Sequence, residues 1–147
     1  MGRLKKANTI EIRLAQGAEE IGLALMLQDL LTQNFEQHPK KIGDFRKLRL
    51  KAGLTVPDAE VALTMEFDEG ILTIHPGILT GSQLLITSEA DMVLALSNVR
   101  IKWGLPYYFD EPGKEVLEAI RSGRIKIKGM IRHFHGLLRL SRIMSVH

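Results

Sequence analysis

Five histidines are the side chains in this sequence best suited to metal binding or proton transfer: His38, His75, His133, His135 and His147. His133 and His135 are two residues apart, so on a helix their rings point about 200° apart. A helical zinc pair needs an i, i+4 spacing instead, whereas on a strand these two rings would share a face. The sequence favours a helix there, and we expect surface histidines rather than a metal site.

The other signatures of catalysis are missing from the sequence. None of the six serines stands in a Gly-x-Ser-x-Gly motif, and no glycines form a dinucleotide-binding or phosphate-binding loop. The chain has no cysteine, which excludes thiolate chemistry, disulfides and cysteine zinc sites. Glu66, Asp68 and Glu69 cluster at a predicted turn, where contact with solvent accounts for them. We therefore expect a protein that is not an enzyme and that uses no cofactor.

The composition is that of one globular domain. Of the 147 residues, 45% are hydrophobic and 25% are charged, and a chain of this size buries roughly two-thirds of its unfolded surface. No apolar run is long enough for a signal peptide or a membrane span. We expect a cytoplasmic protein with one domain over residues 1–147, of which 1–16 form a flexible or helical N-terminal arm.

Basic residues gather at the C-terminal end of the chain. Seven Lys and Arg and no Asp or Glu occur from residue 121 onward, and subtracting these seven from the twenty leaves thirteen against seventeen acids. A final helix over 130–144 would carry Arg132, Arg139 and Arg142 as a basic stripe beside an apolar face. That pattern suits peripheral contact with an anionic membrane, and it equally suits an ordinary solvated face.

Nucleic acid is a weaker expectation for the same basic stretch. Trp103, Tyr107 and Tyr108 are the aromatic side chains that would stack on bases, but they lie away from the basic residues in sequence. The net charge of +3 is also small. We therefore do not expect a nucleic-acid-binding protein.

Hydrophobic periodicity predicts the elements that must position any site. Helical spacing of apolar residues covers 9–34, although 9–14 also alternates like a short strand. The stretch 40–51 is mixed and basic and receives no element. Alternation predicts a hairpin of 61–68 and 71–75 around Glu69-Gly70. Beyond it we expect a strand at 84–87, a helix at 89–96, an extended piece at 99–102, an aromatic loop at 103–109, a helix at 115–121, a strand at 124–128 and the helix at 130–144.

This order of elements indicates an α+β fold. Strands and helices are segregated rather than regularly alternating, which favours one mostly antiparallel sheet with helices covering one face.

Residues 120–129, Ile-Arg-Ser-Gly-Arg-Ile-Lys-Ile-Lys-Gly, resemble the late signature of the sterol carrier protein type-two family. In that family a helix precedes a Gly-Lys/Arg-aliphatic-Lys-aliphatic-x-Gly strand, and a closing helix follows. The hairpin around Glu69-Gly70 and the strand and helix after it resemble the family's central elements, so the likeness runs from about Gly17 onward. The segment 97–112 is longer than the usual family connection.

The resemblance implies a five-stranded sheet, an apolar tunnel between sheet and helices, and binding or transfer of an apolar lipid without chemistry. A fatty acyl chain or a sterol-like or isoprenoid molecule would be the ligand. Candidate lining residues are apolar and lie on predicted inward faces: Met65, Phe67, Met92, Leu96, Leu117, Ile120, Phe134, Leu138 and Met144. An accessory module with the same fold and a filled core, or a basic membrane-surface binder, remains the alternative. The oligomeric state stays open.

Overall fold

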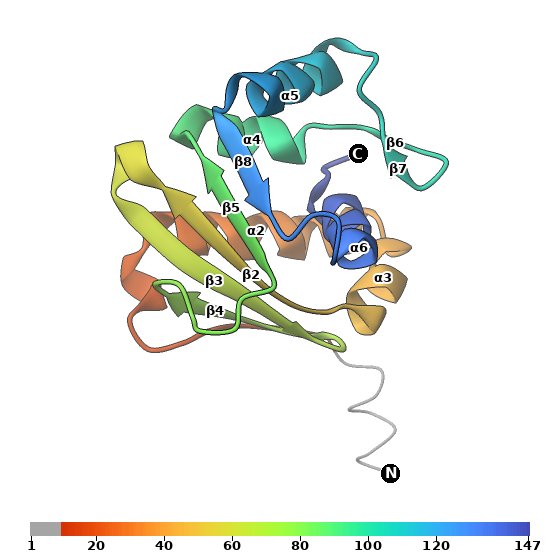
Figure 1. Cartoon of the computed structure of the whole chain (residues 1–147). Coiled ribbons are helices and arrows are strands. Elements are labelled where there is room, and N and C mark those ends of the chain that lie inside the picture. Colours follow the sequence, from red (N-terminus) through yellow and green to blue (C-terminus); the bar gives the residue numbers. More distant parts are fainter. Residues whose placement is uncertain (1–9) are drawn as a thin grey trace.

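A six-stranded mixed sheet forms the centre of the computed structural model, which describes residues 10–147 (Figure 1). Its order is β1-β4-β3-β2-β5-β8. Two neighbouring pairs, β1 with β4 and β2 with β5, are parallel, and the other three are antiparallel. The strands are β1 (Glu11–Leu14), β2 (Arg49–Val56), β3 (Val61–Asp68), β4 (Ile71–Pro76), β5 (Leu84–Ser88) and β8 (Ile125–Lys128).

The expectation of five mostly antiparallel strands is therefore wrong in number and in pairing. One reason is β1, which lies where a helix over 9–34 was predicted. The chain gains a parallel ladder there, since Glu11 N donates to Gly70 O at 3.0 Å and Ala15 N donates to Ile74 O at 2.9 Å. The helix begins only at Gly22, after a left-handed Gly17. Residues 1–9 of the expected N-terminal arm lie outside the described residues.

The second reason is β2, which lies where the sequence predicts no strand. Leu50, Ala52, Leu54 and Val56 alternate inward and are buried. Basic side chains at the start of this strand and a glycine in its middle masked the alternation. In the fold β2 is central, because it pairs with β3 on one side and with β5 on the other.

The hairpin of β3 and β4 confirms the clearest sequence prediction. Its register joins Met65 to Ile74 and Phe67 to Leu72, and the turn at Glu69-Gly70 places both residues at positive φ. Inward-facing Leu63, Met65 and Phe67 are buried, while Glu66 on the other face is half-buried. The period of two thus decides which residues meet the helices.

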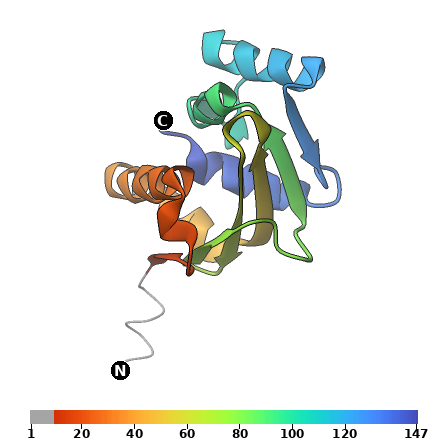
Figure 2. The ribbon, with the colours of Figure 1, turned by 90° about the vertical axis from the view of Figure 1, so that its left-hand side faces the viewer.

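Helices α2, α3 and α6 lie on one side of the sheet, as Figure 2 shows. Helices α4 and α5 lie beyond one end of the layer formed by these three helices (Figure 1). Their bounds are α2 (Gly22–Gln37), α3 (Lys41–Lys47), α4 (Ala90–Ser97), α5 (Glu111–Ser122) and α6 (Phe134–Met144). Short 3₁₀ turns, η1 (Ala18–Glu20) and η2 (Pro57–Ala59), complete the helical structure of residues 10–147.

Helices α5 and α6 begin at other residues than the sequence predicts. Helix α5 begins at Glu111 rather than at 115, since the Asp110 carboxylate accepts a hydrogen bond from Gly113 N at 2.9 Å. Helix α6 begins at Phe134 rather than at 130, because the chain first turns, with His133 N donating to Gly129 O at 3.0 Å.

The predicted extended piece 99–102 and the start of the aromatic loop after it form a second, two-stranded sheet. Strands β6 (Ile101–Lys102) and β7 (Leu105–Pro106) pair antiparallel around Trp103 and Gly104. Both turn residues have positive φ, 54° and 75°, as a type I′ hairpin turn requires. Leu105 and Pro106 lie close to α6, which places this hairpin over the space between α4 and α6.

Candidate functional site

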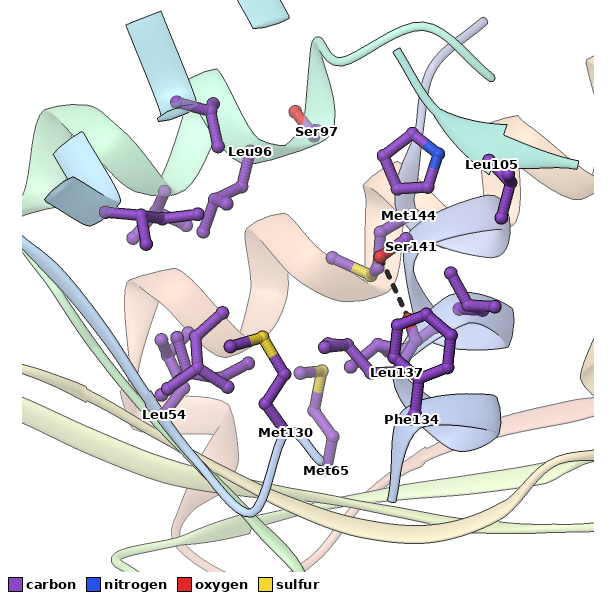
Figure 3. Close-up of a pocket in the computed structure, with 18 of the residues that line it drawn as sticks. Leu54, Met65, Leu96, Ser97, Leu105, Met130, Phe134, Leu137, Ser141 and Met144 are labelled. Carbon is purple, nitrogen blue, oxygen red and sulfur yellow. Dashed lines mark hydrogen bonds between the residues drawn. The ribbon is translucent and has the colours of Figure 1, made fainter. Parts of the chain in front are cut away.

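An apolar pocket of about 420 Å³ lies between the inner face of the sheet and helices α4, α5 and α6 (Figure 3). Its volume falls within the roughly 300–1,000 Å³ typical of small-molecule sites. The walls are aliphatic and aromatic, with only three hydroxyl-bearing residues. They are Leu27, Leu54, Met65, Ile86, Val93, Leu96, Ser97, Leu105, Pro106, Tyr108, Val116, Ile120, Ile127, Met130, Phe134, Leu137, Leu138, Leu140, Ser141 and Met144.

The sheet wall is a row of aliphatic side chains across three strands. Leu54 pairs with Ile86, and Ile86 pairs with Ile127, so the three lie side by side on the inner face. This row exists only because β2 stands between β3 and β5. The strand that the sequence reading missed therefore builds part of the pocket.

The α6 wall follows from helical spacing. Phe134, Leu137, Leu138, Ser141 and Met144 recur at intervals of three and four residues and therefore share one side of the helix. Figure 3 shows Ser141 and Leu137 on this wall, joined by a hydrogen bond.

The serine hydroxyls of the pocket are already satisfied. Ser141 Oγ donates to Leu137 O at 2.9 Å, and Ser97 Oγ donates to Leu94 O at 2.8 Å. Each bond returns to the residue's own helix, which leaves the surface around it effectively apolar. A ligand made of hydrocarbon would leave these hydroxyl donors paired.

Tyr108 is the exception among the lining residues. Its hydroxyl has no hydrogen-bond partner within residues 10–147, and burial raises the pKa of this phenol. The group therefore stays protonated at neutral pH and is free to bond a polar atom of a ligand.

Comparisons with known proteins identify the fold. No family model matches the sequence, and no curated protein matches it either. The solved structure of "UbiJ-SCP2 Ubiquinone synthesis protein" aligns over 86% of this chain and 98% of its own, at 15% identity and a TM-score of 0.59. The chain has a sterol carrier protein 2 fold. A structure of sterol carrier protein 2 itself aligns over 80% of this chain and 90% of its own, at 13% identity and a TM-score of 0.48.

Within this sterol carrier protein 2 fold, six of the nine expected lining residues do line the pocket. They come from β3, α4, α5 and α6: Met65, Leu96, Ile120, Phe134, Leu138 and Met144. Phe67 does not, because it lies in the main core, where its ring meets Phe45 edge-on at 6.2 Å between centroids. Met92 belongs to a second core cluster, and Leu117 is half-buried on α5 without lining the pocket.

Several lining residues were not foreseen. Leu27 on α2 and Leu54 on β2 belong to elements whose bounds or existence the sequence reading missed. Leu105 comes from the β6–β7 hairpin and Met130 from the turn before α6. The alternation of β2 was a usable signal for Leu54, but no local pattern places a hairpin over a distant helix.

The expected basic stripe is also corrected, because Arg142 has another role. Its Nε and Nη2 donate to the two carboxylate oxygens of Asp44, each at 2.9 Å, and Nη1 donates to Gly104 O at 2.9 Å. The hydrogen bond to Asp44 raises the pKa of Arg142 further. Arg139 Nε lies 3.9 Å from the same carboxylate. Of the three arginines, only Arg132 is exposed, and it lies in the turn before α6 rather than on the helix.

Lys41, which contacts Arg142, makes the stability of the fold depend on pH. Its Nζ donates to Arg142 O at 2.5 Å, and burial lowers the pKa of the amine from 10.5, an effect that Asp44 partly opposes. Between its folded pKa and 10.5 the unfolded chain binds more protons, so stability rises with pH across that window.

We therefore expect the free energy of unfolding of wild type to rise, relative to that of Lys41→Met, as the pH approaches 10.5 from neutral. Urea unfolding at a series of pH values measures this difference. Tyr108 titrates in both proteins, so its contribution to the pH dependence of the free energy of unfolding cancels in the comparison. Parallel stability curves for the two proteins would show that Lys41 is not desolvated in the fold.

No group of three or more His, Asp or Glu within residues 10–147 is arranged to hold a metal ion. No helix in the same residues has the length and apolar character needed to cross a bilayer.

Proposed function

We propose that this protein binds an apolar lipid in the pocket and transfers it, without chemistry, as a single lipid-binding domain. The observation that carries the proposal is the roughly 420 Å³ pocket, whose walls are apolar and whose serine hydroxyls are paired within their own helices. Burying hydrocarbon there gains about 0.8 kcal/mol per methylene group. The sterol carrier protein 2 fold is consistent with lipid binding.

The ligand class follows from the wall chemistry. A single acyl or isoprenoid chain matches the aliphatic lining, and the Tyr108 hydroxyl offers one hydrogen bond to a polar end. The fold neighbour's description as a ubiquinone synthesis protein makes an isoprenoid-tailed quinone a natural competitor to test beside fatty acids. We propose that Met65, Leu96, Ile120, Phe134, Leu138 and Met144 contact the chain. An apolar tunnel between the sheet and the helices is part of the proposal.

Native mass spectrometry of the purified protein tests the proposal directly. We expect co-purified lipid, or displacement of bound cis-parinaric acid by palmitate or by an isoprenoid quinone. An empty protein that binds neither probe would favour the alternative, an accessory module that uses the fold for interactions.

A further inference from the structure

Exposed apolar side chains gather where the pocket reaches the surface. Nine large hydrophobic side chains of residues 10–147 are exposed, and six of them fall in two short segments, 103–109 and 130–134. We call these six the mouth surface: Trp103, Leu105, Phe109, Met130, Ile131 and Phe134. Three of them, Leu105, Met130 and Phe134, also line the pocket, so the pocket opens between the two segments.

Trp103 occupies the tip of the β6–β7 hairpin in an unfavourable state. Its side chain is 91% exposed, although tryptophan normally buries most of its large apolar surface. Its φ of 54° is also costly for a bulky residue, and glycine or asparagine would suit this turn better. Neither the core nor the turn geometry accounts for a tryptophan here, whereas an external apolar environment does.

The hairpin is held firmly beside the opening. Gly104 O, next to Trp103, accepts the hydrogen bond from Arg142, and Asp44 fixes Arg142 from α3. Lys102 Nζ lies 4.0 Å from the centre of the Tyr107 ring. Trp103 is thus presented on a braced support rather than on a loose loop.

Basic side chains outnumber acidic ones around the mouth surface. The segments 97–109 and 121–147 contain nine Lys and Arg and no Asp or Glu, although the whole chain has seventeen acidic residues. Lys102 and Arg132 are exposed next to the apolar residues, as is Arg100, whose Nε lies 3.9 Å from an Asp110 carboxylate oxygen. Apolar side chains surrounded by cations complement a lipid surface with negative head groups.

We propose that the mouth surface docks on an anionic phospholipid bilayer, inserting Trp103 and Ile131 between the head groups. This inference rests on the proposed function, because a bilayer at the opening lets a lipid pass between membrane and pocket without crossing water. Ile131 is 92% exposed in the turn opposite the hairpin. Tryptophan is favoured at the depth of the head groups, where one part of its ring is apolar and its N–H finds a partner.

The chain carries its own reporter for this contact, since Trp103 is the one tryptophan in the sequence. Vesicles of phosphatidylcholine with phosphatidylglycerol should shift Trp103 emission to the blue, and brominated phosphatidylcholine should quench it. Vesicles of phosphatidylcholine alone should bind less, and added salt should weaken binding to the anionic vesicles. An emission spectrum that no vesicle changes would overturn the proposal.

Variants separate the apolar and charged contributions in vesicle co-sedimentation. Trp103→Ala and Ile131→Ser should each weaken binding, the first by about tenfold. Leu25→Ala, which trims an exposed leucine on α2, should leave it unchanged. Arg132→Gln should weaken binding by about fivefold, whereas Arg49→Gln, on the opposite face of the sheet, should not. Unchanged binding by either the Trp103 or the Ile131 variant would contradict the proposal.

Two further measurements keep this inference distinct from the proposed function. Trp103→Ala should still carry lipid in native mass spectrometry, because Trp103 does not line the pocket. A wild-type protein that holds lipid but does not bind vesicles would contradict the docking proposal and leave the proposed function intact. If light scattering instead shows a dimer in which Trp103 is already buried without vesicles, a second copy covers the mouth surface and the bilayer proposal falls.

Discussion

Replacing Ser141 by phenylalanine is expected to weaken lipid binding by about fiftyfold while the protein still folds. Ser141 is half-buried, lines the pocket and faces it from the last turn of α6 (Figure 3). A phenyl ring there would fill space otherwise taken by about three methylene groups of a ligand, and each is worth about 0.8 kcal/mol. The pocket provides room for the ring, so the core itself need not be overpacked.

Ser141→Ala is the matched control for this prediction. It removes the same hydroxyl, which bonds only to Leu137 O, but adds no volume to the pocket. We expect alanine to bind cis-parinaric acid as wild type does, with thermal unfolding of both variants showing that they fold. Equal binding by the phenylalanine and wild-type proteins would place the ligand outside this pocket.

Replacing Gly129 by alanine is expected to lower the free energy of unfolding by about 3 kcal/mol. Gly129 has a φ of 87°, and a Cβ at this position would lie 2.2 Å from Gln83 O. That carbonyl belongs to backbone and immediately precedes β5, so relief of the clash must disturb the pairing of β5 with β8. Since Ile86 and Ile127 of these strands line the pocket, lipid affinity should fall as well.

Gly123→Ala separates the clash from the conformational cost. Gly123 has a similar φ of 83°, but its Cβ would meet only the Lys126 Cε, at 3.7 Å. We expect a loss of about 1 kcal/mol, which is the usual penalty for alanine in a left-handed position. Urea unfolding of both variants measures the difference. Equal losses would mean that the approach of Gln83 to Gly129 is relieved without cost.

Gly123 and Gly129 explain why the short motif at 120–129 indicates the fold. Gly123 ends α5 in the left-handed conformation, and Gly129 allows the chain to pass Gln83 before α6. Both requirements concern the backbone, and neither glycine lines the pocket. The motif therefore indicates the fold, while the ligand depends on side chains from other elements.

Local patterns determined much of the architecture. Strict alternation predicted the β3–β4 hairpin, because a strand that meets helices on one face must bury every second residue. Helical spacing placed Leu137, Leu138 and Met144 on one side of α6. These patterns succeed because they depend on contacts between residues close in sequence and on burial of a single face.

The tertiary structure alone decided how these elements meet. Strand β1 forms because the edge of β4 is available, whereas the sequence around residues 10–14 fits both a short strand and a helix. The local sequence predicts a solvated cation at Arg142, but in the fold this side chain pairs with Asp44, which is 98 residues away. Likewise, the pocket lies where β2, β7 and the start of α6 converge from distant parts of the chain. The sequence alone determined which faces are apolar, but the partner of each face depends on contacts between distant segments, which a local pattern does not encode.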